Sequence, residues 1–181
     1  VTYKRELFTS YPDKVMVMRL TASEAHSISF KVRLDRGNGR NFDELEAVTE
    51  DTLVMRGETG GSNGIMFRSA VKAIAENGAV KTLGNHLIVE NADAVTLILT
   101  AATSFRYENP EQQCLETIQL AANKTYEELR QAHIEDYQEL FNRVQLDIGT
   151  QDDRILDLGT DQRLERLKEG KQDLALITTY F

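Results

Sequence analysis

Apolar and polar residues alternate with a period of two through most of the first hundred positions, as in half-buried β-strands. The clearest case is residues 26–35, where Ile28, Phe30, Val32 and Leu34 alternate with polar side chains. Gly, Asn or Pro turns separate such segments, with no helical period between them, which predicts an antiparallel β-sandwich. The strands expected are residues 1–9, 14–22, 26–35, one or two within 45–56, then 65–73, 80–83, 86–90 and 94–102. Residues 14–22 have apolar side chains at both odd and even positions, which predicts a strand that is covered on both faces.

The period changes to that of a helix at residues 110–122. Asn109 is a good N-cap, and Pro110 fits the first helical position, where its missing N–H costs nothing. The apolar positions recur at three- and four-residue steps, so they form one inner stripe. They are Cys114, Leu115, Ile118, Ala121 and Ala122.

A second amphipathic helix is predicted at residues 126–141, opened by a capping box of Thr125 and Glu128. Both helices are expected to lie over one sheet face. Alternation then resumes at residues 144–149 and predicts that the helix runs directly into a strand. The expected apolar face of the helix consists of Tyr126, Leu129, His133, Tyr137, Leu140 and Phe141.

The remaining residues predict short helices. After a polar connector at residues 150–153, Thr160 is expected to cap a helix that Gly170 ends. Asp173 begins another apolar helix, whose Tyr180 and Phe181 have no expected partner in a compact sandwich. The chain opens inside a strand-like run without Met and ends within this helical segment, so we expect a fragment of a longer protein.

Composition narrows the class of partner. The chain has 181 residues and a net charge of -8. This charge argues against a nucleic acid or an anionic membrane surface as partner, and no apolar run approaches the roughly 20 residues of a membrane span. A single cysteine, Cys114, excludes an intramolecular disulfide and a thiolate metal cluster. Localisation stays open.

Several motifs resemble binding or catalytic motifs in composition but lack the residues or the spacing that such sites need. The segment GETGGSNG at residues 57–64 lacks the Lys and Ser/Thr of a phosphate-binding loop and is interpreted as a surface loop. GNGR at residues 37–40 is interpreted as a turn. The histidines at positions 26, 86 and 133 have no metal-ligand spacing, and we expect no metal or other cofactor. The acidic residues fall in turns, on polar helix faces or in the connector.

Four segments in order resemble glycoside hydrolase family 95, which contains bacterial and plant α-L-fucosidases and related α-L-galactosidases. They are YKRELFTSYPDKVMVMRLTAS (3–23), ADAVTLILTAATSF (92–105), HIEDYQELFNRVQLDIG (133–149) and GTDQRL (159–164). The resemblance implies a parent enzyme, expected to be bacterial, that hydrolyses terminal α-L-fucosyl or related L-sugar linkages with inversion at the anomeric carbon. It also implies that the catalytic acid and base sit in an (α/α)₆ barrel, so no catalytic residue is expected in this chain.

The same resemblance implies a supersandwich-like, galactose-mutarotase-like fold. Residues 1–149, with helices 110–122 and 126–141, would be the later part of an N-terminal β-sandwich domain. Residues 150–181 would be a linker and the start of the first barrel helix. The expected partners are that barrel, in the same polypeptide, and an oligosaccharide.

Two groups of residues are candidates for a role. The first ends the last strand and could contact a pyranose, although packing is the simpler interpretation; it comprises Thr103, Ser104, Phe105, Arg106 and Tyr107. The second anchors the contact between sandwich and connector, with position 133 expected to be a core histidine bonded to backbone. It comprises His133, Asp136, Tyr137 and Phe141.

Two alternative functions remain open at this stage. A stand-alone carbohydrate-binding module would expect a platform of exposed aromatic residues, and the chain has no Trp, six Tyr and seven Phe. A structural interaction domain would use its apolar C-terminal end as a partner surface. Glycan binding would favour the first of these, and a homodimer through that end the second.

Overall fold

A computed structural model describes residues 1–36, 42–149 and 152–180, without the side chains of residues 42, 43 and 180. The turn predicted at residues 37–40 and the end residue Phe181 lie outside this description. The contacts divide the chain into two compact units, Val1–Tyr137 and Gln138–Phe181. Each unit is described by itself.

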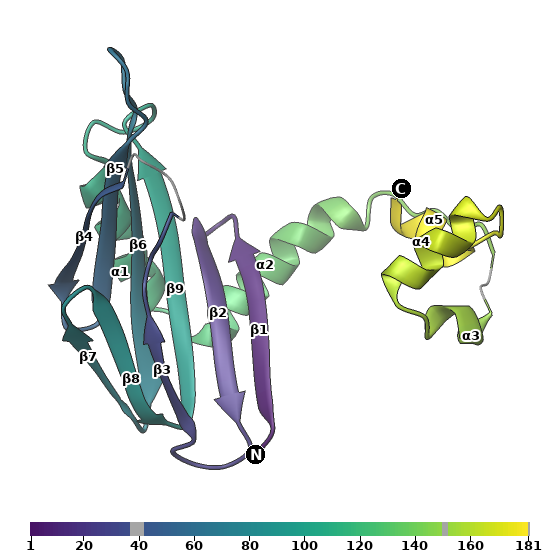
Figure 1. The fold of residues 1–181 in the computed structure, drawn as a ribbon, viewed down its shortest axis with the longest axis horizontal. Coiled ribbons are helices and arrows are strands. Elements are labelled where there is room, and N and C mark those ends of the chain that lie inside the picture. The colour runs from purple at the N-terminus through teal and green to yellow at the C-terminus, as the bar shows by residue number, and fades with distance from the viewer. Residues whose placement is uncertain (37–41, 150–151, 181) are drawn as a thin grey trace. The chain divides into compact units, whose positions relative to one another are not determined.

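The first unit contains two antiparallel sheets, which confirms the predicted fold class (Figure 1). In the described residues, one sheet has six strands in the order β1-β2-β9-β6-β5-β4, and the other has three in the order β3-β8-β7. The strands are β1 (Tyr3–Ser10), β2 (Val15–Ala22), β3 (Ile28–Val32), β4 (Phe42–Thr49), β5 (Thr52–Glu58), β6 (Met66–Glu76), β7 (Ala79–Leu83), β8 (His86–Ala92) and β9 (Ala94–Thr103).

The six-stranded sheet is the middle layer of this unit. The three-stranded sheet covers one face, and helix α1 (Pro110–Ala122) lies on the other, as Figure 1 shows. Leu53, Val71, Leu87, Val89 and Val95 are prominent in the core between the sheets. Val17, Val54, Ile98, Cys114 and Ile118 are prominent in the core beneath the helix.

Strand β2 departs in part from its predicted burial. Val15 and Val17 are buried on the face toward the helices, whereas Met16 on the opposite face keeps 39% of its surface exposed. Leu20 and Ala22, nearer the end of the strand, pack against the core between the sheets. The smaller sheet therefore covers only the second half of β2, so the prediction of two covered faces is right for that half alone.

Helix α1 begins as its sequence predicts. The side chain of Asn109 accepts a hydrogen bond from the backbone N–H of Gln112 at 3.0 Å, and Pro110 occupies the first turn. Cys114, Ile118 and Ala121 are buried against the sheet. The stripe predicted for this helix is therefore its packing face.

Replacing Asn109 by alanine should lower the free energy of unfolding by about 1 kcal/mol, because one backbone donor at the helix start loses its acceptor. Urea denaturation would measure this change. Asn109→Asp restores a capping oxygen and should recover most of the loss. Equal loss in both variants would contradict the assigned capping role.

Helix α2 (Tyr126–Phe141) has the predicted capping box, but packs only through its first half. The Thr125 N–H donates to Glu128 Oε2 at 2.7 Å, and the Glu128 N–H donates to Thr125 Oγ1 at 3.2 Å. Leu129 is 1% exposed, whereas Phe141 is 62% exposed. The prediction that the apolar face packs throughout is wrong, because beyond Tyr137 the helix belongs to the second unit.

The strand predicted at residues 144–149 is also wrong. These residues have no regular secondary structure. In the described chain, both sheets consist of strands from the set β1 through β9, and none of residues 144–149 takes part. A strand is stabilised by hydrogen bonds to a neighbouring strand, and the alternation of Val144, Leu146 and Ile148 does not supply one. Val144 accordingly keeps 64% of its surface exposed.

The second unit contains α3 (Asp153–Leu156), α4 (Thr160–Lys168) and α5 (Leu174–Tyr180). Gly159, rather than Thr160, is the N-cap of α4, and Gly170 follows its end with a φ of 80°. The Asp173 side chain is fully buried; it accepts from Arg163 Nε at 2.8 Å and Nη2 at 2.6 Å. It also caps α5 by accepting from the Leu176 N–H at 2.9 Å.

Those contacts with Arg163, followed by the Leu176 hydrogen bond, lower the pKa of Asp173 to about 2.

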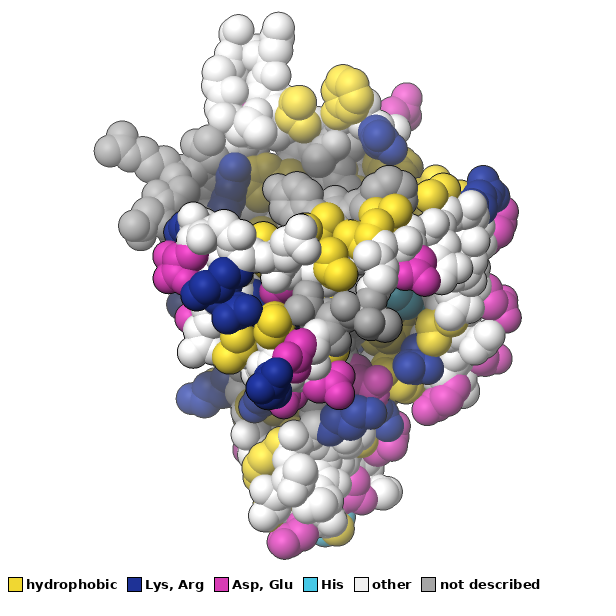
Figure 2. Space-filling model, turned by 90° about the vertical axis from the view of Figure 1, so that its right-hand side faces the viewer, with side chains coloured by type: hydrophobic (Ala, Val, Ile, Leu, Met, Phe, Trp, Pro, Cys, Tyr) yellow, Lys and Arg dark blue, Asp and Glu magenta, His cyan; other side chains and the backbone are white. Residues whose placement is uncertain are grey.

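Figure 2 shows hydrophobic side chains among acidic and basic ones on the protein surface. In this unit Leu156, Leu164 and Ile177 are among the exposed large hydrophobic residues. An ion pair, and not an apolar cluster, therefore occupies the best-buried position of the second unit's described residues.

His26 joins three turns at one end of the sandwich. Its Nδ1 lies 3.0 Å from the carbonyl oxygen of Asn91 and 3.1 Å from that of Asn77, and its backbone N–H donates to Asp93 Oδ1 at 2.6 Å. The hydrogen bond to Asn91, followed by the charge of Asp93, raises the pKa of His26 above 6.5. The folded state therefore favours the protonated imidazole.

The stabilisation from His26 should be complete below its unfolded pKa of about 6.5 and should disappear as pH rises through the higher folded value. The melting temperature of the unchanged chain should therefore exceed that of His26→Gln most at acidic pH, with a difference that narrows toward pH 8. A melting series over this pH range measures it, with His86→Gln as the control. A gap that widens as pH rises would contradict this sign.

Candidate functional site

A pocket of about 830 Å³ opens where β9 extends beyond its neighbour β2. Strand β9 pairs with β6 as far as Thr103, but its pairs with β2 end at Leu99. The lining of the pocket includes residues from both faces of the sheet at this notch. Its polar and aromatic lining includes Tyr11, Lys14, Arg36, Arg106, Tyr107 and Gln113.

The turn before β2 forms one side of the pocket. Lys14 has a left-handed φ of 57°, which few non-glycine residues adopt. Its backbone N–H donates to the Tyr11 carbonyl at 3.2 Å, and its own carbonyl accepts from Thr100 Oγ1 at 2.8 Å. These two hydrogen bonds hold the Lys14 backbone against β9.

The turn after β9 also borders the pocket and contains the residues named as candidates for sugar contact. The Thr103 carbonyl accepts from the N–H groups of Arg106 at 3.2 Å and Tyr107 at 3.1 Å. Ser104 Oγ accepts from the Met66 N–H at 3.0 Å and so serves the pairing of β6. Phe105 is 78% exposed. The structure thus brings Thr103, Arg106 and Tyr107 into the pocket lining, which Ser104 and Phe105 do not join.

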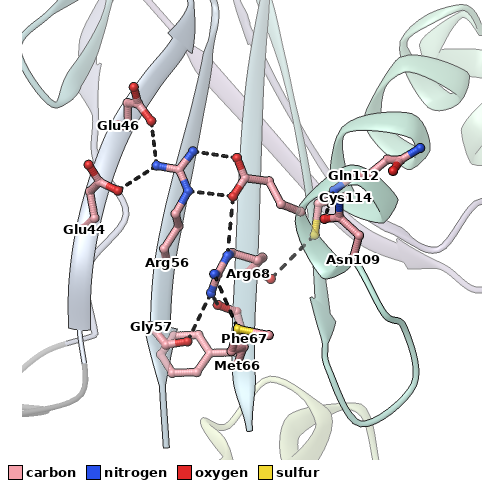
Figure 3. Close-up of polar contacts among 11 residues, drawn as sticks. Glu44, Glu46, Arg56, Gly57, Met66, Phe67, Arg68, Asn109, Gln112 and Cys114 are labelled. Carbon is pink, nitrogen blue, oxygen red and sulfur yellow. Dashed lines mark hydrogen bonds and ion pairs between the residues drawn. The ribbon is translucent and has the colours of Figure 1, made fainter.

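The floor of the pocket includes the helix α1 residue Cys114, which is 1% exposed. Burial raises the pKa of its thiol to about 11, and its Sγ donates to the Arg68 carbonyl at 3.6 Å. Arg68, also in the lining, donates through Nη1 to the carbonyls of Phe67 at 2.8 Å and Gly57 at 3.3 Å (Figure 3). The floor is therefore built by contacts between α1 and β6.

A charge network centred on Arg56 fixes α1 beside this floor. Arg56 donates to Glu111 through Nε at 2.6 Å and Nη2 at 2.5 Å. Its Nη1 donates to Glu44 at 2.8 Å and Glu46 at 2.6 Å, as Figure 3 shows. The hydrogen bonds from Arg56 lower the pKa of Glu111, which also lies 3.4 Å from Arg68 Nε. One arginine thus joins β4, β5 and α1.

The junction residues lie along α2 in two different settings. The His133 ring stacks on Phe8 of β1, with 5.1 Å between ring centroids, and this contact replaces the backbone hydrogen bond expected of a core histidine. Asp136 is half-buried, and Tyr137 is 53% exposed with its ring 6.1 Å from that of His133. His133 therefore lies in a packed contact with the sheet. The anchoring role of the group stays a prediction.

The pocket can offer hydroxyl, amide and cationic hydrogen-bond donors together with aromatic rings. In the described chain its lining has no Asp or Glu. The described residues also contain no cluster of three or more His, Cys, Asp or Glu fit to hold a metal. Every helix in the same residues falls short of the length and apolar character that a membrane span needs. A pocket lining with hydrogen-bond donors and aromatic rings but without carboxylates suits ligand binding better than acid–base chemistry.

Comparison with known proteins defines the class as glycoside hydrolase. Residues 1–108 match the family model described as "Glycosyl hydrolase family 65, N-terminal domain", and residues 125–181 match "Glycosyl hydrolase family 95 catalytic domain". The first match covers more than half of the chain, so the chain belongs to the family of glycosyl hydrolase family 65 N-terminal domains. The resemblance to family 95 proteins is thereby confirmed.

Two curated relatives that match this chain are both named as fucosidases. "Alpha-L-fucosidase 2" of Arabidopsis thaliana is 27% identical over 215 aligned positions, covering 100% of this chain and 25% of that protein. "Probable alpha-fucosidase A" of Aspergillus niger is 27% identical over 161 positions, covering 79% of this chain and 20% of that protein. The chain therefore spans a quarter or less of the length of either relative.

Proposed function

We propose that this chain is the β-sandwich part, with the adjoining linker, of an α-fucosidase-like hydrolase acting on terminal α-L-fucosyl or related L-sugar linkages. Two family matches in one chain support it, since a sandwich match is followed by a catalytic-domain match. The names of both relatives support the substrate class. The partner is then the remainder of the catalytic domain, an (α/α)₆ barrel in the same polypeptide.

In this proposal the sandwich domain ends at residue 149 and includes α1 and α2. Residues 150–181 form the linker and the start of the first barrel helix. The described contacts of α2 support this arrangement, because Leu129 packs in the core beneath the sheet. The helix is then a continuous connection between the sandwich and the segment that follows.

The role proposed for this chain is saccharide contact without bond cleavage. Inverting glycosidases use two carboxyl groups about 6.5–9.5 Å apart across the scissile bond. The absence of Asp and Glu from the described pocket lining is the observation that carries this role. Tyr11 and Phe105, which are 81% and 78% exposed, lie in the turns beside the pocket and can meet a pyranose face.

The test is incubation of this chain with an aryl α-L-fucoside and, separately, calorimetric titration with a fucosylated oligosaccharide. We expect aryl alcohol release at the uncatalysed rate, against rapid release by a characterised α-L-fucosidase. We also expect saccharide binding that Tyr11→Ala weakens and that Tyr3→Ala, which removes an aromatic 52% exposed on β1, leaves unchanged. Turnover by this chain would overturn its non-catalytic role.

A further inference from the structure

The pocket at the end of β9 is basic within an acidic protein. The chain has 29 acidic and 21 basic residues. The pocket lining contains Lys14, Arg36, Arg68 and Arg106 and, in the described residues, no acid. Arg68 is paired with Glu111, 3.4 Å from its Nε, so Lys14, Arg36 and Arg106 are the cations that count here. The local excess of positive charge is therefore opposite in sign to the net charge of the chain, which favours a negatively charged ligand at this place.

Two of the acids that lie close to the pocket are paired with other partners. Asp13, between Tyr11 and Lys14, keeps 4% of its side chain exposed and accepts from Lys124 Nζ at 2.5 Å and Ser10 Oγ at 2.6 Å. Glu111, beside Arg68, is held by two hydrogen bonds from Arg56. Neither carboxylate is left to cancel the charge of the exposed cations.

Lys14 and Arg106 come from the two turns that border the pocket, and both have exposed side chains. Neither pairs with an acid in the described part of the chain. Their backbones are fixed by the hydrogen bonds to Thr100 and Thr103 described above, so little backbone order has to be gained when a ligand binds. Arg36 adds a third cation, placed over the Phe67 ring at 4.4 Å from its centroid.

The other lining groups suit a sugar ring better than a bare ion. Tyr11 and Tyr107 provide aromatic faces, and Thr103, Gln113 and Thr117 provide neutral hydrogen-bonding groups. A volume of about 830 Å³ is far larger than one inorganic anion and falls within the usual range of small-molecule sites. The lining thus combines recognition of a ring with recognition of a negative charge.

We infer that this pocket binds an anionic saccharide, with a sulfate ester or a carboxylate held between Lys14 and Arg106. The inference rests on the proposed saccharide-contacting function and names its substrate class. A charge-assisted hydrogen bond from an arginine or lysine to such a group is stronger than one between neutral partners. The negative group is therefore the part of the ligand that gives the pocket its selectivity.

Calorimetric titration of this chain with four ligands tests the inference. The ligands are a neutral fucosylated oligosaccharide, the same oligosaccharide with one sulfate, a matched one with a uronic acid, and inorganic sulfate. We expect at least one charged saccharide to bind about tenfold more tightly than the neutral one. Its affinity should fall as salt is raised from about 0.02 to about 0.5 M, because screening weakens exposed charge pairs.

Variants locate the effect. Lys14→Gln and Arg106→Gln should each weaken binding of the charged saccharide about tenfold and leave the neutral one nearly unchanged. Lys31→Gln is the control, since Lys31 is exposed on β3 and does not line this pocket. Melting curves of each variant establish that it is folded before it is titrated.

Each other outcome decides against the inference in a recognisable way. Equal binding of neutral and charged saccharides would overturn it and leave the proposed saccharide contact standing. Inorganic sulfate binding as tightly as the sulfated saccharide would show a simple anion site and overturn the saccharide class. No binding of any saccharide would overturn both the inference and the proposed contact. The sulfated and uronic acid arms separate the two sources of negative charge.

Discussion

Leu129→Ala is expected to lower the free energy of unfolding of the first unit by about 2–5 kcal/mol. Leu129 is 1% exposed and packs in the core between α2 and the six-stranded sheet. Truncation removes buried methyl groups and leaves a cavity that neighbours on a sheet fill poorly. Urea denaturation followed by circular dichroism would measure a lower transition midpoint with an unchanged slope.

Phe141→Ala, on the same helix, is the matched control. Position 141 is 62% exposed, so its truncation should cost less than about 1 kcal/mol in spite of the larger side chain removed. A full burial of this residue would instead predict about 3–5 kcal/mol. Similar losses at positions 129 and 141 would contradict the division of α2 between two units.

Arg56→Met should cost about 1–3 kcal/mol, because it leaves Glu111 beside the sheet without its main partner. The side chains of Arg56 and Glu111 are 18% and 26% exposed, so solvent screening reduces the loss below that of a fully buried pair. Lys81→Met, which breaks an exposed pair with Glu90, should cost under about 0.5 kcal/mol. A double-mutant cycle with Glu111→Gln measures the coupling, and coupling near zero would contradict the proposed network.

The stabilisation by the Arg56–Glu111 pair should depend on pH in the acidic range. Because Arg56 lowers the pKa of Glu111, the pair stabilises the fold fully above the unfolded value of about 4.3. That contribution is lost as pH falls through the lower folded pKa. The difference in stability between the unchanged chain and Arg56→Met should therefore shrink in acid and remain constant near neutral pH.

The strands were predictable because the signals that define them are local. Alternation marks a half-buried strand, and the turns between strands have residues suited to left-handed backbone, such as Asn77 with its φ of 51°. The starts of both long helices were predictable for the same reason, since Asn109 and Thr125 act on N–H groups three residues away.

The partner of an amphipathic segment was not predictable from its period. Periodicity shows that one face is apolar but leaves open what covers that face. Leu129 and Leu140 occupy the same predicted face of α2, yet the first is 1% and the second 61% exposed. Residues 144–149 have strand periodicity, but a strand also requires a neighbouring backbone, which no local pattern specifies.

The candidate site was predictable on one side only. The turn after β9 combines an aromatic and a cation at a strand end, which is a local signal. Tyr11 and Lys14 were missed because an antiparallel register brings them to the site; Lys14 and Thr100 are 86 positions apart where they bond. The Tyr-Pro-Asp sequence before Lys14 is a local turn signal. The position of Lys14 beside β9 depends instead on strand pairing.

The buried thiol of Cys114 allows the detachment of helix α1 from the sheet to be followed by cysteine labelling. It is the single cysteine in the sequence, and at 1% exposure a labelling reagent cannot reach it while α1 rests on β6. With a pKa of about 11 it also supplies little reactive thiolate at neutral pH. The rate of its alkylation therefore counts how often α1 lifts from the sheet, without any probe having to be introduced.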